Sequence, residues 1–397
     1  MAGPLAGIRV LDLGRFVACP FCGMLLADLG AEVIRVERSD GAEDRFYELL
    51  TPGGDGYTFV NVNRNKKGIS LNFERNKKAR EILNQLVKHS DVVIENFSPE
   101  AADAIGITYD NFKAIKPDII FARVSAFGPT GPYSHRIGFD MIAKAMSGSM
   151  AVSGFPGPPC RDQVVWVDYS TACLTAVGVV AALYHRQRTG QGQVIDTALL
   201  QTAVTYMAPI IGEWETGKAL REQAGNRRYW TGPCDLYQTK DGRWVMLALI
   251  TKGIWRRFCR FIGREDLITD PRFHSDLARW EHRHILDPIV REWVASQTAE
   301  EVIAVGEKIP IPCGICHTQT EVAHHPQVEA REMLTEVTSP DGSGKVLVSG
   351  IPLRMSETSL KIESSFPAIG QHNREIYCGL LGYSHEYLAT LKEEGVI

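Results

Sequence analysis

The first forty residues alternate between strand-like and helix-like patterns, and this alternation limits the folds that are open to the chain. Residues 8–13 (IRVLDL) are typical of a strand. Residues 20–30 (PFCGMLLADLG) are typical of a helix, with Pro20 in the first turn and a glycine at the end. Residues 31–37 (AEVIRVE) predict a second strand. A strand, a helix and a strand in about thirty residues form a βαβ unit, which predicts a parallel sheet.

The loop of this unit argues against a dinucleotide site. It reads GRFVACP and lacks the G-x-G-x-x-G glycines that let a pyrophosphate approach the backbone. Glu37 nevertheless ends the second strand, where a dinucleotide fold often places an acid on a ribose. We therefore expect a Rossmann-like α/β layout without an NAD signature.

Expected strands and helices continue to alternate up to about Gly225, where the pattern of the sequence changes. We expect further strands in residues 91–97 and 117–128, and a short strand that begins at residue 193. We expect helices in residues 77–90, in a long run from residue 169, and after the short strand. After Gly225, two strand-like runs flank Lys240-Asp241-Gly242, which predicts a hairpin. Helical stretches (254–263, 298–308), a strand (344–355) and a closing helix (384–395) complete the chain. A length of 397 residues suits two domains, the second one smaller and α+β.

Charge and composition exclude several classes of function. The formal net charge is −4, so no overall basic field argues for a nucleic-acid partner. No uninterrupted apolar stretch is long enough to cross a bilayer, so no membrane partner is expected. The first residues, MAGPLAGIRVLDLG, do not show the basic and apolar regions of a signal peptide. We therefore expect a cytoplasmic protein.

The nine cysteines do not predict a disulfide framework, because their number is odd and they are scattered. Two pairs have C-x-x-C spacing, Cys19–Cys22 and Cys313–Cys316. Together they could in principle hold zinc. The first pair could instead be a redox dithiol, since a helix starting there would lower a thiol pKa. Buried inert cysteines are the favoured interpretation, and no metal site is expected.

A basic run covers residues 63–80. It contains Arg64, Lys66, Lys67, Arg75, Lys77, Lys78 and Arg80. Such a run usually forms a solvated face. The alternative is a site for a phosphorylated ligand, because Arg and Lys make charge-assisted contacts with phosphate.

Asp168 stands at an unusual boundary, directly after the apolar run Val164–Val167 and before a long run of small and apolar residues. An ionised carboxylate facing a low dielectric is costly unless something satisfies it. One explanation is a helix N-cap, for which Asp is favoured. The other is a nucleophile kept away from water.

Seven stretches of this sequence, taken in order, resemble the class III CoA-transferases, the family that includes formyl-CoA transferase and carnitine CoA-transferase. They are residues 5–38, 63–73 (NRNKKGISLNF), 90–107, 126–148, 186–196 (RQRTGQGQVID), 311–333 and 369–376 (IGQHNREI). The resemblance covers essentially the whole chain. It implies a Rossmann-like large domain built from both chain ends, with residues 1–205 as its first part and 340–397 as its return. It also implies a small domain in 225–325, linkers between these parts, and an interlocked, ring-like homodimer.

The resemblance also implies the site. It places the catalytic aspartate on Asp168. It implies coenzyme A contacts at Val17, Ala18, Arg38, Leu71, Asn96 and Phe97. Arg38 is the most persuasive of these, because a cationic fork suits a CoA phosphate. Family members often carry a basic residue just before the aromatic of the GFD motif, where this chain has Ile137-Gly138, and Arg136 could stand in for it.

In this interpretation no cofactor is bound permanently, and CoA is part of the substrates. The partners are an acyl-CoA and a small carboxylic acid. A carboxylate of ordinary pKa would attack the thioester to give an enzyme–acyl anhydride and then an aspartyl-CoA thioester. Water must be kept from both. The glycine-rich loop that covers the site in formyl-CoA transferase has no counterpart here, since the comparable stretch reads LALITKGIW.

Three alternatives stay open. An α-methylacyl-CoA racemase has the same fold but uses a histidine where this chain has Phe139, which cannot carry a proton. The chain could be a non-catalytic subunit of a heteromeric CoA-transferase. It could also be a plain CoA-binding or redox protein built on the CPFC pair. Among neighbouring residues, we expect His135 to be a surface histidine, Asp140 to cap the helix that follows it, and Trp166 to be core or pocket wall.

Overall fold

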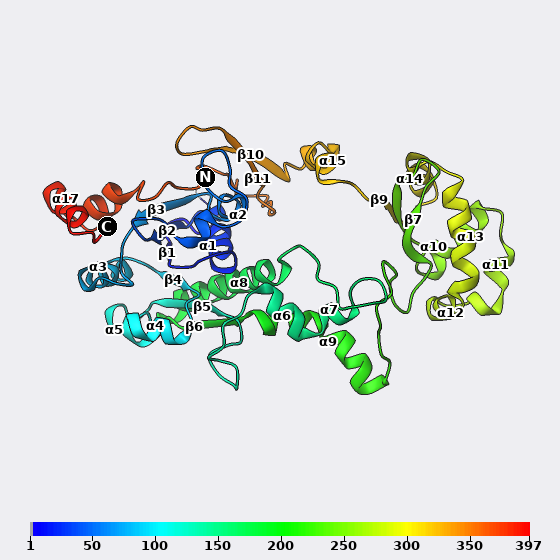
Figure 1. The fold of residues 1–397 in the computed structure, drawn as a ribbon, viewed down its shortest axis with the longest axis horizontal. Coiled ribbons are helices and arrows are strands. Elements are labelled where there is room, and N and C mark those ends of the chain that lie inside the picture. The colour runs from blue at the N-terminus through cyan, green and yellow to red at the C-terminus, as the bar shows by residue number, and fades with distance from the viewer. Residues whose placement is uncertain (1–2) are drawn as a thin grey trace. The chain divides into compact units, whose positions relative to one another are not determined.

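A parallel sheet of six strands organises the larger of two units in the computed structural model, which describes residues 3–397 (Figure 1). The strands are β1 (Arg9–Asp12), β2 (Glu32–Glu37), β3 (Lys66–Ser70), β4 (Val92–Glu95), β5 (Ile120–Ser125) and β6 (Val194–Ala198). Their order is β3-β2-β1-β4-β5-β6, and every neighbouring pair is parallel. The predicted βαβ unit is confirmed, with α1 (Ala18–Asp28) between β1 and β2.

Both faces of this sheet are buried, because alternate strand residues point to opposite sides. Val10, Val92 and Ile94 belong to the core on the side of α1 and α8 (Trp166–Thr189). Leu11 and Val93 belong to the core on the other side. That side is covered by α3 (Lys77–Lys88), α5 (Tyr109–Ile115) and α17 (His385–Glu393). The layout explains why even charged strand residues such as Arg35, Glu37 and Lys66 are buried.

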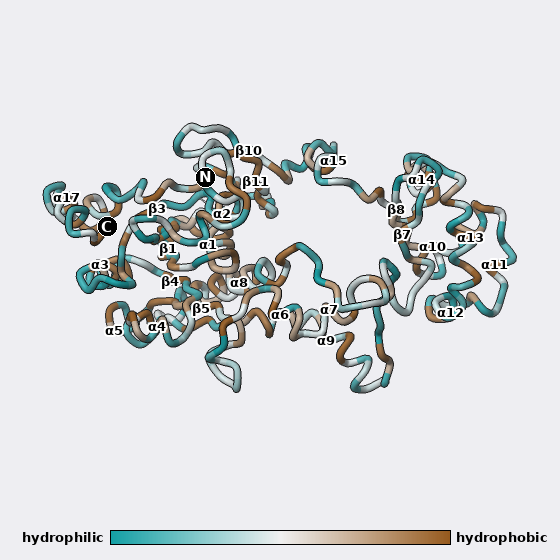
Figure 2. Tube along the Cα trace, in the orientation of Figure 1, coloured by the Kyte–Doolittle hydropathy of each residue, from teal (hydrophilic) through white to brown (hydrophobic). Residues whose placement is uncertain are grey.

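The long helix α8 packs against α1, β5 and β6 along one side. It ends at Gly190, whose φ of 73° is the left-handed conformation that glycine adopts without strain. It is the one helix of residues 3–397 with the length and composition of a membrane span, and 44% of its most apolar window is buried inside the protein. Figure 2 colours the trace of α8 by the hydropathy of its residues. The structure therefore uses α8 as a core helix of the sheet unit with one uncovered side.

Other segments complete the unit, which comprises the described chain up to Ser147, Gln163–Ala208 and Pro326–Ile397. They are η1 (Glu43–Phe46), α2 (Tyr57–Val62), α4 (Pro99–Ile105), α6 (Asp140–Ser147), the first part of α9 (Leu199–Gly217), α16 (Pro326–Ala330), β10 (Leu334–Thr338), β11 (Lys345–Ser349) and η3 (Arg374–Leu380). β10 and β11 form an antiparallel pair. Val337 and Val346 of this pair pack with Phe59 and Val60 of α2. The C-terminal hairpin thus shares a core with the N-terminal half of the chain.

The second unit comprises Gly148–Asp162 and Pro209–His325. Its sheet contains β7 (Cys234–Gln238), β8 (Trp244–Ala248) and β9 (Cys313–Ile315), all antiparallel. The hairpin predicted around Lys240-Asp241-Gly242 is confirmed as β7–β8. Its helices are α7 (Ser149–Val152), α10 (Lys252–Phe261), α11 (Asp266–Thr269), η2 (Pro271–Phe273), α12 (Asp276–Glu281), α13 (Arg283–Ala295), α14 (Ala299–Lys308) and α15 (Gln319–Ala323).

The expectation that the basic run of residues 63–80 is a solvated face is wrong for two of its members. Arg64 is buried and pairs with Asp28 at 2.6 Å. Lys66 is buried, pairs with Asp12 at 2.7 Å and donates to the carbonyl of Pro20 at 2.7 Å. These ion pairs tie α1 to the sheet, so the two cations are structural.

Candidate active site

The residues expected to contact CoA gather at one edge of the parallel sheet. Val17 and Ala18 follow β1, Arg38 follows β2, Leu71 follows β3, and Asn96 and Phe97 follow β4. The carboxyl ends of parallel strands share an edge, and the strand order reverses between β1 and β4. Such a reversal leaves a crevice in which ligands of open α/β sheets bind. The fold therefore brings these residues, which are far apart in the sequence, to the same edge of the sheet.

The turn between β1 and α1 is held by side chains from neighbouring strands. The amide group of Asn96 both accepts from the backbone nitrogen of Arg15 (2.8 Å) and donates to its carbonyl (2.9 Å). Phe16 adopts a φ of 62°, and its N–H donates to Asp44 at 3.0 Å. A Cβ on Gly14 would lie 2.2 Å from that of Cys19, so the turn requires glycine. Each polar atom of the Asn96 side chain therefore makes one hydrogen bond to this turn, so Asn96 fixes its backbone.

The N-terminus of α1 offers donors at this edge. The backbone N–H groups of Val17, Ala18 and Cys19 have no hydrogen-bond partner within residues 3–397. The first N–H groups of a helix have no partner in the helix itself and lie at the positive end of its dipole. They are suited to stabilise a negative oxygen.

Arg38 lies beside a shallow cavity of about 350 Å³ that Arg75 and Asn76 also line. Its guanidinium is partly exposed and pairs with Asp40 at 3.1 Å. Leu71, by contrast, is fully buried, so its side chain contributes packing. Two cations on one small surface could accept a phosphate.

The backbone of Phe97 is set by Glu95, which is fully buried at the end of β4. One oxygen of Glu95 accepts from the N–H of Phe97 at 2.8 Å. Burial raises the pKa of Glu95 to about 8, and this hydrogen bond and the charge of Arg123 only partly oppose the shift. Glu95 thus shapes the turn that carries Asn96 and Phe97.

Asp168 lies in the first turn of α8 and is held there by Asp140. Val165 is the N-cap residue, so the expectation that Asp168 might be the N-cap is wrong. One carboxylate oxygen of Asp140 instead accepts from the N–H groups of Val167 (2.9 Å) and Asp168 (3.4 Å). Asp140 begins α6, and this oxygen satisfies two backbone donors in the first turn of α8. Its capping of α6 stays a prediction.

The other oxygen of Asp140 pairs with Lys144 at 2.9 Å, one turn further along α6. Both side chains are buried, and Lys144 also donates to the carbonyl of Val164. Its ammonium lies 5.5 Å from the centre of the Trp166 ring, which packs on the core as expected. The pair therefore fixes the segment that carries Asp168. Sequence reasoning missed Lys144, although the i, i+4 spacing to Asp140 was a signal for it.

The half-buried carboxyl group of Asp168 is harder to ionise than an ordinary aspartate. Burial raises the pKa of Asp168 to about 7, the charge of Asp140 adds to this, and Lys144 partly offsets it. The expectation of an ordinary pKa is therefore wrong. At neutral pH a substantial fraction of this side chain is ionised but poorly solvated, which strengthens a carboxylate as a nucleophile.

Aromatic contacts join the β1–α1 turn to the segment before α6. The rings of Phe16 and Phe139 meet edge to face at 5.5 Å. Further along, Phe21 of α1 meets Tyr169 of α8 at 4.7 Å. The turn, the GFD segment and the start of α8 thus form one continuous surface.

Residues 135–137 lie outside these contacts. His135 and Arg136 are exposed, and the guanidinium of Arg136 lies 3.9 Å from the centre of the Tyr133 ring. Arg136 lies in the loop between β5 and α6, and its backbone N–H donates to the carbonyl of Tyr133 at 2.9 Å. Its proposed contact with CoA stays a prediction.

The interpretation of Cys19 and Cys22 as a redox dithiol is wrong. Both side chains are fully buried and free. Burial raises the pKa of each thiol, and the charge of Asp12 adds to the shift. Thiols that do not ionise are unreactive. No cluster of three or more metal-ligating side chains occurs in the part of the chain that the structure describes.

Glu37 is likewise not available to a ribose. It is fully buried and pairs with Arg45 at 2.5 Å and Arg35 at 3.8 Å. The acid at the end of β2 is therefore part of the scaffold.

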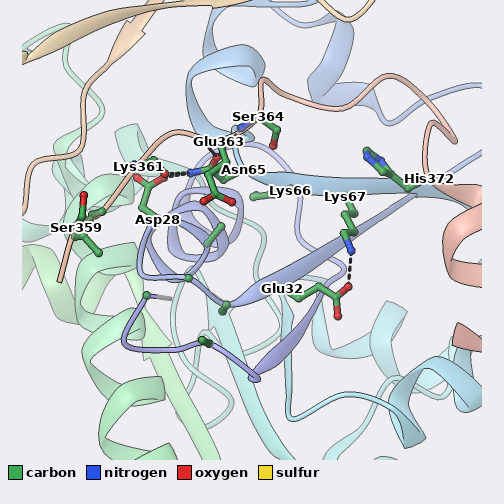
Figure 3. Close-up of a pocket in the computed structure, with 16 residues that line it drawn as sticks. Asp28, Glu32, Asn65, Lys66, Lys67, Ser359, Lys361, Glu363, Ser364 and His372 are labelled. Atoms are coloured by element: carbon green, nitrogen blue, oxygen red, sulfur yellow. Dashed lines mark hydrogen bonds and ion pairs between the residues drawn. The ribbon is translucent and has the colours of Figure 1, made fainter. Parts of the chain in front are cut away.

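A larger cavity, of about 530 Å³, lies at the opposite edge of the sheet (Figure 3). It is lined by Glu32 and Lys66 at the beginnings of β2 and β3, and by the tail segment around Lys361 and Glu363. Figure 3 shows that Lys67, on its wall, is already paired with Glu32, at 2.6 Å. It contains none of the residues expected at the site, and its place at the amino ends of the strands is not where such sheets bind ligands.

Comparisons with known proteins show the family of this chain. The model of CoA-transferase family III matches residues 5–373. The chain is 37% identical to the succinyl-CoA–D-citramalate CoA-transferase of Chloroflexus aurantiacus, over 99% of this chain and 98% of that protein. It is 32% identical to the formyl-CoA:oxalate CoA-transferase of Streptomyces coelicolor, over the full length of both. It is also 32% identical to the succinyl-CoA–L-malate CoA-transferase beta subunit of Chloroflexus aurantiacus, over 99% and 98%. The crystal structure of a CAIB/BAIF family protein from Brucella suis matches with a TM-score of 0.83 and 31% identity, over 96% of this chain and all of that one.

Proposed function

The chain belongs to CoA-transferase family III and is a CoA-transferase, and from this premise we propose that Asp168 moves CoA from an acyl-CoA donor to a free carboxylic acid by covalent catalysis. The single observation that carries the proposal is the placement of Asp168. It is a half-buried carboxyl group with a pKa of about 7, in the first turn of α8, next to the sheet edge where the expected CoA contacts gather.

The reaction consists of two anhydride–thioester exchanges. A carboxylate oxygen of Asp168 attacks the thioester carbonyl of the donor, the C–S bond breaks, and CoA leaves as the thiolate. The thiolate then attacks the aspartyl carbonyl of the mixed anhydride and releases the donor acid, which leaves an aspartyl-CoA thioester. The carboxylate of the acceptor repeats these steps in reverse. Asp168 is regenerated, and the acceptor departs as its CoA thioester.

The residues around Asp168 supply what these steps need. The pair Asp140–Lys144 holds the start of α8, so the nucleophile keeps one position through four displacements. The uncommitted amides of Val17, Ala18 and Cys19 are suited to the oxyanion of each tetrahedral intermediate. The apolar rings of Phe16 and Phe139 favour exclusion of water from the activated acyl groups. Arg38 would bind a phosphate of CoA, with Arg75 beside it.

Trapping of the intermediate tests this mechanism. Incubation with an acyl-CoA and hydroxylamine should convert Asp168 into its hydroxamate, which peptide mass spectrometry detects. Asp168→Asn should reduce transfer by at least about a hundredfold, because an amide is a poor nucleophile. Asp103→Asn is the matched control, since Asp103 is an exposed aspartate on α4. Retention of transfer by Asp168→Asn, or a hydroxamate elsewhere, would refute the assignment.

A racemase activity would leave a different trace. It requires a base and an acid on opposite faces of the α-carbon, and Phe139 offers no proton. The enzyme is therefore expected to introduce no deuterium into a chiral 2-methylacyl-CoA in deuterium oxide. Rapid α-deuteration that Asp168→Asn eliminates would replace the transferase mechanism by proton abstraction.

A homodimer, interlocked as in the related family, is part of the proposal. On α8, Leu174, Val177 and Tyr184 are exposed, with Val177 at 66% and Tyr184 at 61%. Contiguous exposed apolar surface of this kind usually marks a protein interface. A second copy of the chain is the occupant we propose, whereas one relative is named as a subunit of a larger enzyme. Light scattering on the chain expressed alone, together with a transfer assay, separates an active homodimer from a subunit that needs a partner.

A further inference from the structure

A cavity of about 450 Å³ opens beside Tyr169, the residue that directly follows Asp168 on α8. It lies wholly in the larger unit and is lined by segments far apart in the sequence. Phe21 comes from α1, Asn61 from α2, and Ser349–Pro352 from the end of β11 and the loop that follows. Its volume is in the range of small-molecule sites. None of the expected CoA contacts lines it.

Most of its wall is apolar, and its polar groups are few and fixed. Phe21, Met333, Ile351 and Pro352 supply apolar surface. Asn61 accepts from the N–H of Ser349 at 2.8 Å. Its side chain faces Tyr169, where it partly opposes the rise in the Tyr169 pKa that burial causes.

The wall formed by Ser349 and Gly350 is anchored to the core. The buried guanidinium of Arg64 donates to the hydroxyl of Ser349 at 3.0 Å and to the carbonyl of Gly350 at 3.4 Å. Arg64 is itself paired with Asp28 at 2.6 Å. The cavity therefore has a preformed wall, as binding sites usually have.

Two arginines complete the lining, Arg331 and Arg354. Arg354 donates to the backbone carbonyl of Arg331 at 2.7 Å, which brings the two residues together. It also pairs with Glu332 at 3.2 Å, but that carboxylate is 83% exposed and screened by water. Arg331 has no acidic partner within ion-pair distance among the described residues. An apolar cavity with a cationic rim suits a short acid that carries a second negative group, and planar guanidinium groups match carboxylates in particular.

We propose that this cavity is the acid subsite of the enzyme, and that Arg331 and Arg354 bind a second carboxylate on the acid that gives up or receives CoA. The inference rests on the proposed function, since it assumes that Asp168 is the nucleophile. The reacting carboxyl group lies at Asp168, the carbon chain passes Tyr169 and the apolar wall, and the second carboxylate ends between the two guanidinium groups. The enzyme thus selects dicarboxylic over monocarboxylic acids.

Matched acids of equal length test this selection. Transfer to succinate and to butyrate is measured for the wild type, for Arg331→Gln/Arg354→Gln and for Arg354→Lys. The wild type should prefer succinate. The double variant should lose at least about tenfold of that preference, mainly through KM, because it removes two charge-assisted contacts. Transfer to butyrate should change by less than about twofold. Arg354→Lys should lose part of the preference, because its ammonium keeps the charge but not the planar pair of donors that matches a carboxylate.

Arg272→Gln is the control, since Arg272 is an exposed arginine that is paired with Asp270 in the second unit. An unchanged preference in the double variant, or an equal loss for both acids, would overturn the inference and leave the transferase mechanism intact. If the wild type transfers CoA to no acid, the proposed mechanism fails. A direct measurement of succinate binding then tests whether the cavity is an acid subsite. Carbon-13 succinate should then bind the wild type but not the double variant in an NMR titration. Equal binding, or none to the wild type, would overturn the inference.

Discussion

Replacing Asp168 by asparagine should change how the folding stability of this protein depends on pH. Burial, with the charge of Asp140 second, raises the pKa of Asp168 from 3.8 to about 7, while Lys144 offsets part of the shift. Between these two pH values the folded chain holds a proton that the unfolded chain releases. The buried carboxyl group does not reduce folding stability below pH 3.8. Its destabilising effect grows as the pH rises from 3.8 to about 7 and is complete above pH 7.

The magnitude follows from the size of the shift. A shift of about three pKa units corresponds to about 4 kcal/mol. As the pH rises, the folded protein loses about 1.7 kcal/mol of stability by pH 5 and about 2.6 kcal/mol more between pH 5 and pH 8. The Asp168 side chain is only half-buried, so solvent screening reduces the second figure to about 1–2 kcal/mol. The Asp168→Asn variant has no carboxyl group to ionise at this position and escapes this cost.

Urea unfolding at pH 5 and pH 8, followed by tryptophan fluorescence, measures the effect. The free energy of unfolding of Asp168→Asn minus that of the wild type should be about 1–2 kcal/mol larger at pH 8 than at pH 5, because only the wild type loses stability over this range. The exposed control Asp103→Asn should show no such change with pH. A difference that is independent of pH, or that has the opposite sign, would refute the claim that Asp168 is hard to ionise in the folded chain.

Three further predictions concern the scaffold, the CoA contact and the cysteines. Asp140→Asn leaves the buried Lys144 without its carboxylate, so the free energy of unfolding should fall by about 3–5 kcal/mol. Adding Lys144→Met should recover most of this loss, and additive losses in the double variant would contradict the pairing. Arg38→Ala should raise the KM for the acyl-CoA by about ten- to a hundredfold, in line with one lost charge-assisted contact; the same rise with a thioester that lacks the 3′-phosphate would show that Arg38 binds elsewhere on CoA. Cys19 and Cys22 should resist an aromatic disulfide reagent in the native protein and react in urea, as mass spectrometry of labelled peptides would show, because burial raises the pKa of both thiols; rapid labelling of the native protein would contradict their burial.

Local sequence patterns predicted the framework well. The strand and helix of residues 8–30 and the hairpin around Lys240-Asp241-Gly242 were readable because hydrophobic periodicity and turn residues act over a few positions. The parallel pairing of β1 and β2 was readable too, since a short crossover leaves little topological choice. The resemblance to class III CoA-transferases added the family, which local patterns alone do not carry.

The properties of the candidate site were decided by packing across long sequence distances. Asp140 satisfies backbone donors of α8 that lie 27 and 28 residues away, so no local pattern could separate this role from capping its own helix. Lys66 looked like part of a solvated basic run until its pairing with Asp12, 54 residues away, placed it in the interior. Such contacts exist only once the sheet and its covering helices have formed.

Asp168 shows most clearly which properties follow from the sequence and which follow only from the tertiary structure. The sequence by itself identified it as a carboxylate at an apolar boundary and, through the family motifs, as the expected nucleophile. Its place inside the helix, its half-buried environment and its pKa of about 7 came only with the tertiary structure. The physical reason is that the free energy of a charge depends on the solvent removed and the charges placed around it, and both are set by chain segments distant in sequence.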